Sequence, residues 1–322
     1  MRPRLVPRPR PFLVAPLAAA AALLACAPGA LATFPGHNGR IAFHSATATE
    51  GRQIFTVRPN GRDLRQITHV AGDAINVDWS PDGRRIAFEI DTEDSATVAL
   101  MNADGSGLAT LPGVGVVNGD PSFTPDGRRL VYAFFDGEHG GIASMRLDGT
   151  DQRIVQANDG EDPNVSPDGR TISLTCIQEG GVLQALCTFP FGGGAVTNLT
   201  PFTAEVGAKS DWAPDGRRLV YTDHADLPSP GDSANVATVG ADGTGARLLT
   251  SFSGGDVNAF AGSYSPDGRQ IVLRLEDHGR FGLFTIRPDG THLRAILPLS
   301  DFAPRFIDWG PRAAGDEDED DD

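Results

Sequence analysis

The chain has 322 residues, with 42 acidic and 27 basic side chains, and its formal net charge is −15 at pH 7. This balance excludes nucleic acid as the expected partner, because phosphates require a basic surface. A chain of this length can bury a sizeable core within one domain.

Residues 1–32 are predicted to be an export signal. Four arginines lie within the first ten residues, an apolar run covers residues 12–25, and residues 30–32 match a signal-peptidase site. The apolar run is too short to span a membrane. The protein is therefore expected in the periplasm, the cell envelope or the medium. A second interpretation stays open, because residues 23–26 resemble a lipobox in which Cys26 would carry a lipid anchor.

The segment that follows repeats a pattern of an aromatic or apolar residue, a Pro-Asp-Gly turn and a short apolar run. The clearest copy is residues 79–88, WSPDGRRIAF. Proline presets the first corner of a tight turn, aspartate bonds its own backbone and glycine accepts a positive φ, so each copy predicts a β-hairpin. The turn aspartates of five copies lie 42–52 residues apart: Asp82, Asp126, Asp168, Asp215 and Asp267.

Each repeat has a second half that supplies two more strands. Residues 98–105, VALMNADG, end in another Asp-Gly turn, and related segments begin near residues 54, 142, 236 and 283, with a degenerate copy near residue 186. Four short strands in a unit of about 40–50 residues are typical of a propeller blade. The strand aromatics are expected in the core: Trp79, Phe88, Phe123, Tyr132, Trp212, Tyr221, Tyr264 and Trp309.

The two ends of the repeat region each hold part of a sixth copy. Residues 38–43 supply a turn and a second strand, and residues 306–311 supply a first strand. Paired in one sheet, they complete a blade and close the ring without an open edge. The predicted fold is all-β, a six-bladed β-propeller of four antiparallel strands per blade over residues 33–312. Residues 313–322 are predicted to form a disordered acidic tail.

The WSPDGRRIAF pattern resembles the repeat of TolB-type, WD-like β-propellers, over about residues 34–312. The resemblance implies a non-enzymatic protein-binding or scaffold module of the cell envelope, expected to be a monomer without a cofactor. The same repeat occurs in lyases and beside the hydrolase domain of oligopeptidases, so the fold alone leaves function open. TolB also has a separate N-terminal α/β domain, for which no room is expected here, and this puts its Tol–Pal role in doubt for this chain.

Because the strands alternate in direction, their connections fall on two faces of the propeller. The turn face carries the repeated Asp-Gly turns, and the loop face carries the variable connections, where binding residues usually lie. The loop face is predicted to be acidic and to bind a cationic partner, or one bridged by a divalent ion such as calcium. The alternative is that these loop tips are merely solvated. The candidate binding residues are Glu93, Asp94, Glu138, His139, Asp223, His224, Asp226, Asp277 and His278.

An enzyme is the competing interpretation. The sequence has neither a Gly-x-Ser-x-Gly nor a His-Glu-x-x-His motif, which favours a non-enzymatic role. A metal-assisted hydrolase or lyase acting on a carbohydrate or lactone would need a metal site on the loop face. Its candidate ligands are His139, His224 and His278, with Asp223 or Asp277.

Two cysteines remain if Cys26 leaves with the signal. Cys176 and Cys187 flank the hairpin between two strands of one repeat. A cross-strand disulfide in an oxidising compartment is one prediction, and a pair of buried thiols is the other.

Overall fold

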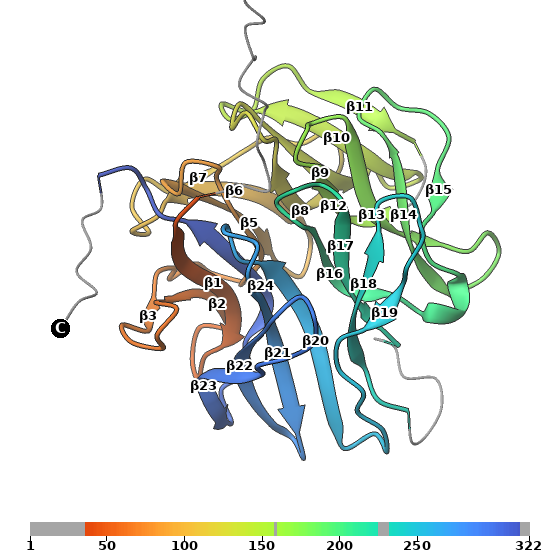
Figure 1. Ribbon diagram of the computed structural model, residues 1–322. Coiled ribbons are helices and arrows are strands. Elements are labelled where there is room, and N and C mark those ends of the chain that lie inside the picture. The colour runs from red at the N-terminus through yellow and green to blue at the C-terminus, as the bar shows by residue number, and fades with distance from the viewer. Residues whose placement is uncertain (1–35, 158–159, 225–231, 316–322) are drawn as a thin grey trace, which may run out of the picture.

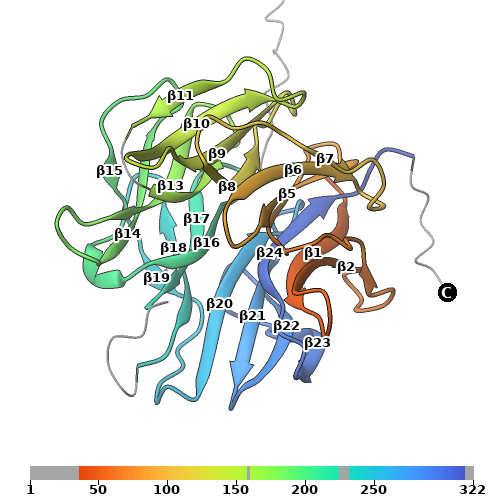
Figure 2. The ribbon, with the colours of Figure 1, turned by 180° about the vertical axis from the view of Figure 1, so that it is seen from behind.

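The computed structural model describes residues 36–157, 160–224 and 232–315, which fold as β-strands arranged around a central axis (Figures 1 and 2). The only helix in these ranges is a single 3-10 turn, η1 (Phe202–Ala204). Within the same ranges no helix is long and apolar enough to cross a membrane.

The first sheet joins the two ends of the repeat region. Its order is β24 (Arg305–Pro311), β1 (Asn38–Ala46), β2 (Arg52–Val57) and β3 (Arg65–Gln66). Trp309 lies opposite Ile41, and Asp308 lies opposite Ala42, in an antiparallel pairing. Figure 1 shows this contact as the red β1 beside the blue β24. The predicted pairing of the C-terminal strand with the N-terminal strands is therefore confirmed.

Three further sheets have four antiparallel strands each, in sequence order from the axis outward. One holds β12 (Gly160–Val165), β13 (Thr171–Ile177), β14 (Gln184–Pro190) and β15 (Thr197–Asn198). The next holds β16 (Gly207–Trp212), β17 (Arg218–Asp223), β18 (Asn235–Gly240) and β19 (Arg247–Leu248). The last holds β20 (Val257–Tyr264), β21 (Ile271–Asp277), β22 (Arg280–Ile286) and β23 (Arg294–Ser300).

The remaining strands form one sheet of eight rather than two separate sheets. It contains β4 (Asp73–Trp79), β5 (Arg85–Asp91), β6 (Ala96–Asn102) and β7 (Ala109–Thr110), and also β8 (Val117–Phe123), β9 (Arg129–Phe135), β10 (Gly140–Arg146) and β11 (Arg153–Gln156). The two groups of four are joined into one sheet by a single parallel bridge between Ala96 of β6 and Val117 of β8. The two repeats therefore keep their own antiparallel hairpins, and they also pack against each other through a shared apolar layer.

The Pro-Asp-Gly turns form the hairpins that the sequence predicts. After β4, the Ser80 hydroxyl donates to the Asp82 carboxylate and accepts the amide hydrogen of Arg85, at 2.6 and 2.9 Å. Gly83 closes the turn with φ of 67°, a backbone conformation that suits glycine. Equivalent glycines with positive φ follow in the other copies: Gly127, Gly169, Gly216 and Gly268.

The core consists of apolar layers between neighbouring sheets. One layer combines Ala42 and Ile54 of the first sheet with Val77 and Phe88 of the next. Another combines Ile41 and Trp309 with Val272 of the last sheet, so the layers continue around the ring. All eight aromatic residues expected in the core are buried, as predicted. This packing fixes the inner strands, which line the axis.

Candidate functional site

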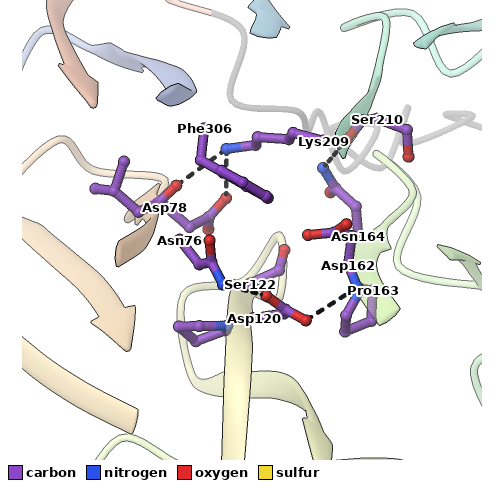
Figure 3. Close-up of a pocket in the computed structure, with 12 residues that line it drawn as sticks. Asn76, Asp78, Asp120, Ser122, Asp162, Pro163, Asn164, Lys209, Ser210 and Phe306 are labelled. Atoms are coloured by element: carbon purple, nitrogen blue, oxygen red, sulfur yellow. Dashed lines mark hydrogen bonds and ion pairs between the residues drawn. The ribbon is translucent and has the colours of Figure 1, made fainter. Parts of the chain in front are cut away.

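The inner strand of every sheet breaks register near its middle, which turns side chains toward the axis. The irregularities lie between Ile75 and Asp78 in β4, and at the equivalent places in β8, β12, β16, β20 and β24. β-Bulges often re-aim a side chain in this way. The residues brought into the central channel include Asn76, Asp120, Asp162, Lys209 and Phe306, and Figure 3 shows them around a cavity of about 30 Å³. A space of that size holds no more than a water or two.

Lys209, the only lysine of the chain, is buried at the centre of this channel. Its Nζ lies 3.1 Å from Asp308 Oδ1 and 3.8 Å from Asp78 Oδ1, and it donates to the Val77 carbonyl at 3.1 Å. Burial alone would lower the pKa of Lys209, but the surrounding carboxylates outweigh it and raise the pKa. Protonated Lys209 therefore joins its own strand β16 to β4 and β24. Figure 3 shows its contacts with β4.

The same carboxylates also join neighbouring sheets through the backbone. Asp308 accepts the amide hydrogen of Trp79, and Asp78 accepts that of Phe123, at 2.8 and 2.9 Å. Asp211 does the same for Tyr264 at 2.8 Å. This half of the channel is a structural network, because each buried charge already has a partner.

Among the described residues, the carboxyl groups in the other half of the channel form no ion pair. Asn76 Nδ2 donates to both Asp120 Oδ1 and Glu89 Oε2, and the Asp120 amide donates to Glu89 Oε2 at 3.1 Å. Burial, followed by repulsion from neighbouring carboxylates, raises the pKa of Asp120 well above its usual range. Burial, followed by the charge of Glu161, raises the pKa of Asp162 to about 7. The charge of Lys209 lowers the pKa of Asp162, but by less than burial and Glu161 raise it.

We expect Asp162→Asn to stabilise the protein at high pH only. The native carboxyl binds a proton up to about pH 7, whereas an unfolded aspartate releases it near pH 4. Native Asp162 therefore lowers the free energy of unfolding progressively as pH rises between these values. Asparagine tolerates the φ of 52° at this position. Urea unfolding should show a gain of roughly 1–3 kcal/mol at pH 8.

The gain should disappear at pH 3, where the native and unfolded carboxyls are both largely protonated. Asp94→Asn, in an exposed loop, is the matched control and should change little at either pH. An equal gain from Asp162→Asn at both pH values would show that charge burial at this residue is not the cause.

A larger cavity opens on the loop face beside these carboxylates, with a volume of about 390 Å³. It lies where the sheets of β8–β11 and β12–β15 meet. Glu89, Asp120 and Glu161 supply its acidic wall. Apolar side chains line the rest: Val117, Phe134, Phe135 and Ile177.

Arginine side chains gather on the opposite side of the channel mouth, within the loop face that the sequence predicts to be acidic. His44 stacks on Phe306, with ring centroids 5.4 Å apart. Burial lowers the pKa of His44 to about 3, and the nearby Arg52, Arg305 and Arg274 add to this effect. Arg274 lies over the Phe260 ring at 4.1 Å and bonds Glu276 at 2.7 Å. The loop face therefore carries both signs of charge, in separate places.

The candidate residues predicted from the loops do not converge on one site. Asp223 bonds His224 at 3.0 Å and Asp277 bonds His278 at 2.5 Å, each within its own loop. The others that the structure describes are exposed: Glu93, Asp94, Glu138 and His139. Asp226 lies outside the described residues. Within the described ranges, no three His, Cys, Asp or Glu side chains are arranged to hold a metal ion, so the hypothetical metal site gains no geometric support.

Sequence reasoning missed the channel residues. Lys209 is not among the candidate residues of the sequence analysis, although it occupies the repeat position of Asn76, Asp120 and Asp162. In each copy this position lies three residues before the repeated turn segment, which begins at Trp79 in the clearest copy. The shared position is the signal that could have identified Lys209. The exchange of an amide or carboxylate for an ammonium at one position of a repeat indicates a specific contact.

Cys176 and Cys187 are joined as a disulfide between β13 and β14. Their Cα atoms are 5.9 Å apart, within the usual range for a disulfide, and both residues are buried. This linkage fits an oxidising compartment.

Comparisons with known proteins agree with the propeller fold. Residues 26–189 match the family model described as TolB beta propeller domain. A 48-residue segment is 44% identical to the Tol-Pal system protein TolB of Nitratidesulfovibrio vulgaris, covering 15% of this chain and only 11% of that protein.

Two solved structures show the same fold at low sequence identity. TolB from Acinetobacter baumannii has a TM-score of 0.69 and 21% identity, over 85% of this chain and 67% of that chain. Hydrazine synthase from Kuenenia stuttgartiensis has a TM-score of 0.64 and 14% identity, over 86% of this chain and 48% of that chain. The likeness concerns the fold, since functions on such scaffolds differ.

Proposed function

The chain belongs to the TolB β-propeller domain family, and from that premise we propose that it is an exported, non-enzymatic protein-binding module of the cell envelope. We further infer a six-bladed propeller, in which the eight-stranded sheet is counted as two blades because its two groups of four strands are each antiparallel. The export signal predicted from the sequence at residues 1–32 and the Cys176–Cys187 disulfide support a location outside the cytoplasm.

One observation carries the proposal for binding. Large apolar side chains are exposed together on the loop face at the ends of β8, β9 and β13. We call them the apolar rim: Val116, Val117, Phe135 and Ile177, each 39–59% exposed. The Val116 amide bonds the Phe135 carbonyl, and Val117, Phe135 and Ile177 line one cavity. Contiguous exposed apolar side chains on a soluble protein mark an interaction surface.

The channel supports binding rather than chemistry at its centre. Lys209, Asp78 and Asp308 already satisfy one another and the backbone, and the space between them is water-sized. A partner would therefore meet the loop face and its cavities, while the inner network holds the scaffold rigid.

We expect Phe135→Ser combined with Ile177→Ser to weaken partner binding by at least tenfold, because buried aromatic and aliphatic anchors supply most interface energy. The partner is first captured from the host's exported proteins on the immobilised mature chain and identified by mass spectrometry. Its dissociation constant is then measured by calorimetry with purified components.

The matched control is Ile154→Ser combined with Leu248→Ser. These residues are as exposed, at 60% and 51%, but lie on the outer strands β11 and β19. The control pair should change the dissociation constant less than twofold. If both pairs of substitutions weaken partner binding equally, or if neither pair weakens it, the partner docks elsewhere.

A further inference from the structure

We propose that the 390 Å³ cavity inside the apolar rim receives the guanidinium or ammonium group of a partner's arginine or lysine side chain. This inference rests on the proposed function, since it names the chemistry of the group that the partner inserts.

The first support is a deficit of positive charge. In the part of the chain that the structure describes, no ion pair involves Glu89, Asp120, Glu161 or Asp162. Across the same channel, Asp78 and Asp308 both have Lys209 within 4 Å. One half of the channel thus carries its own cation, and the other half leaves carboxylates facing a cavity.

The second support is the state of the Glu89 side chain, which is only 8% exposed. Its Oε2 accepts hydrogen bonds from Asn76 Nδ2 and the Asp120 amide. No hydrogen bond to its Oε1 is found among the described residues, and Oε1 is not among the fully buried atoms, so this oxygen of a largely buried side chain is open to a donor from the cavity. A buried carboxylate is expensive to leave incompletely paired, and a charge-assisted donor would satisfy it.

Gly119 allows this arrangement. A β-carbon at that position would lie 2.3 Å from Glu89 Oε2, so only glycine lets the carboxylate lie against the β8 backbone. The Glu89 carboxylate is thereby held at the cavity wall rather than in solvent.

The shape and lining of the cavity select an organic cation. Its volume lies at the lower end of the range for small-molecule sites, enough for a guanidinium or ammonium group and its stem. Phe134 and Phe135 line the wall, and aromatic rings suit both a cation and the methylenes of its stem. Among the described residues the acidic groups do not form a metal-ligand set, which argues for an organic cation over a metal ion.

The experiment uses two small probes that differ in charge, Nα-acetyl-arginine methylamide and its neutral isostere Nα-acetyl-citrulline methylamide. Each is titrated into the mature chain carrying 4-fluorophenylalanine at position 135, and the fluorine resonance is followed. We expect saturation with the arginine probe at a dissociation constant of about 1 mM. The citrulline probe should bind at least tenfold more weakly. Equal responses to the two probes would overturn the inference.

Two variants test whether the arginine probe binds in this cavity. Glu161→Lys changes the charge of an exposed residue on the cavity wall and should weaken binding of the arginine probe at least tenfold. Glu93→Lys makes the same charge change in a loop that does not line the cavity, and should weaken binding of the arginine probe less than threefold. Equal weakening by both would mean that the probe senses only the general charge of the face.

The outcome is separable from that of the proposed function. If the rim variants lose the partner but the arginine probe fails to bind, the cavity inference is wrong and the binding surface stands. If the probe binds as expected but the rim variants keep the partner, the cavity is a cation site and the protein partner docks elsewhere.

Discussion

Lys209→Met is expected to lower the free energy of unfolding by about 3–5 kcal/mol, because it leaves buried carboxylates without their cation. Asp308 and Asp78 both lie within 4 Å of the Lys209 ammonium, and burial together with Asp308 already raises the pKa of Asp211 to about 7. Methionine matches the length and volume of the lysine stem, so lost packing contributes little. Urea unfolding at pH 7.5, followed by tryptophan fluorescence, measures the loss.

The loss should be smaller at pH 5 than at pH 7.5. Carboxyls whose native pKa is raised take up protons as pH falls, and this relieves their repulsion in the folded state. Adding Asp308→Asn to Lys209→Met should recover part of the stability at pH 7.5, since it removes one uncompensated charge. A loss under 1 kcal/mol for Lys209→Met would show that the buried ammonium is not needed to hold the inner strands.

Trp309→Ala should cost about 3–5 kcal/mol, the usual range for truncating a buried tryptophan. Trp309 is 4% exposed, its Nε1 donates to the Gly39 carbonyl at 3.1 Å, and its amide donates to Ser263 Oγ at 2.7 Å. These contacts join the last sheet, β24 and β1. The measurement is urea unfolding combined with hydrogen exchange of the native state.

Trp212→Ala is the matched control. Trp212 is also buried, and its Nε1 donates to the Asn164 carbonyl at 3.2 Å, away from the chain ends. Both variants should lose similar stability, but only Trp309→Ala should accelerate exchange selectively in β1 and β24. If the two variants accelerate exchange in the same strands, the C-terminal strand does not close the ring.

The repeat made most of the architecture predictable from the sequence. Ser80 to Gly83 and their equivalents form the predicted turns because the turn chemistry is local. The ring closure was predictable because residues 38–43 and 306–311 are complementary fragments of one repeat. The joining of two repeats in one sheet was not, since a single bridge between Ala96 and Val117 depends on how two blades pack.

The candidate site was much less predictable. The acidic loop residues were predicted to form the binding site because they are abundant in the variable loops. In the structure, Asp223 and Asp277 instead bond the histidines beside them. The carboxylates that meet, Glu89 and Asp120, lie on strands far apart in sequence and come together through β-bulges. Bulges leave no clear pattern in one sequence, so the contact between Glu89 and Asp120 could not be foreseen. The repeat position that Asp120 shares with Lys209 is the one signal of the channel cluster that the sequence contains.

The central claim is that the partner docks on the loop face over the apolar rim. Hydrogen–deuterium exchange of the mature chain, with and without the purified partner, tests it most directly. We predict that protection on binding will concentrate in residues 115–119, 133–141 and 160–177, while the Pro-Asp-Gly turns exchange as in the free protein. Protection confined to those turns, on the opposite face, would contradict the claim.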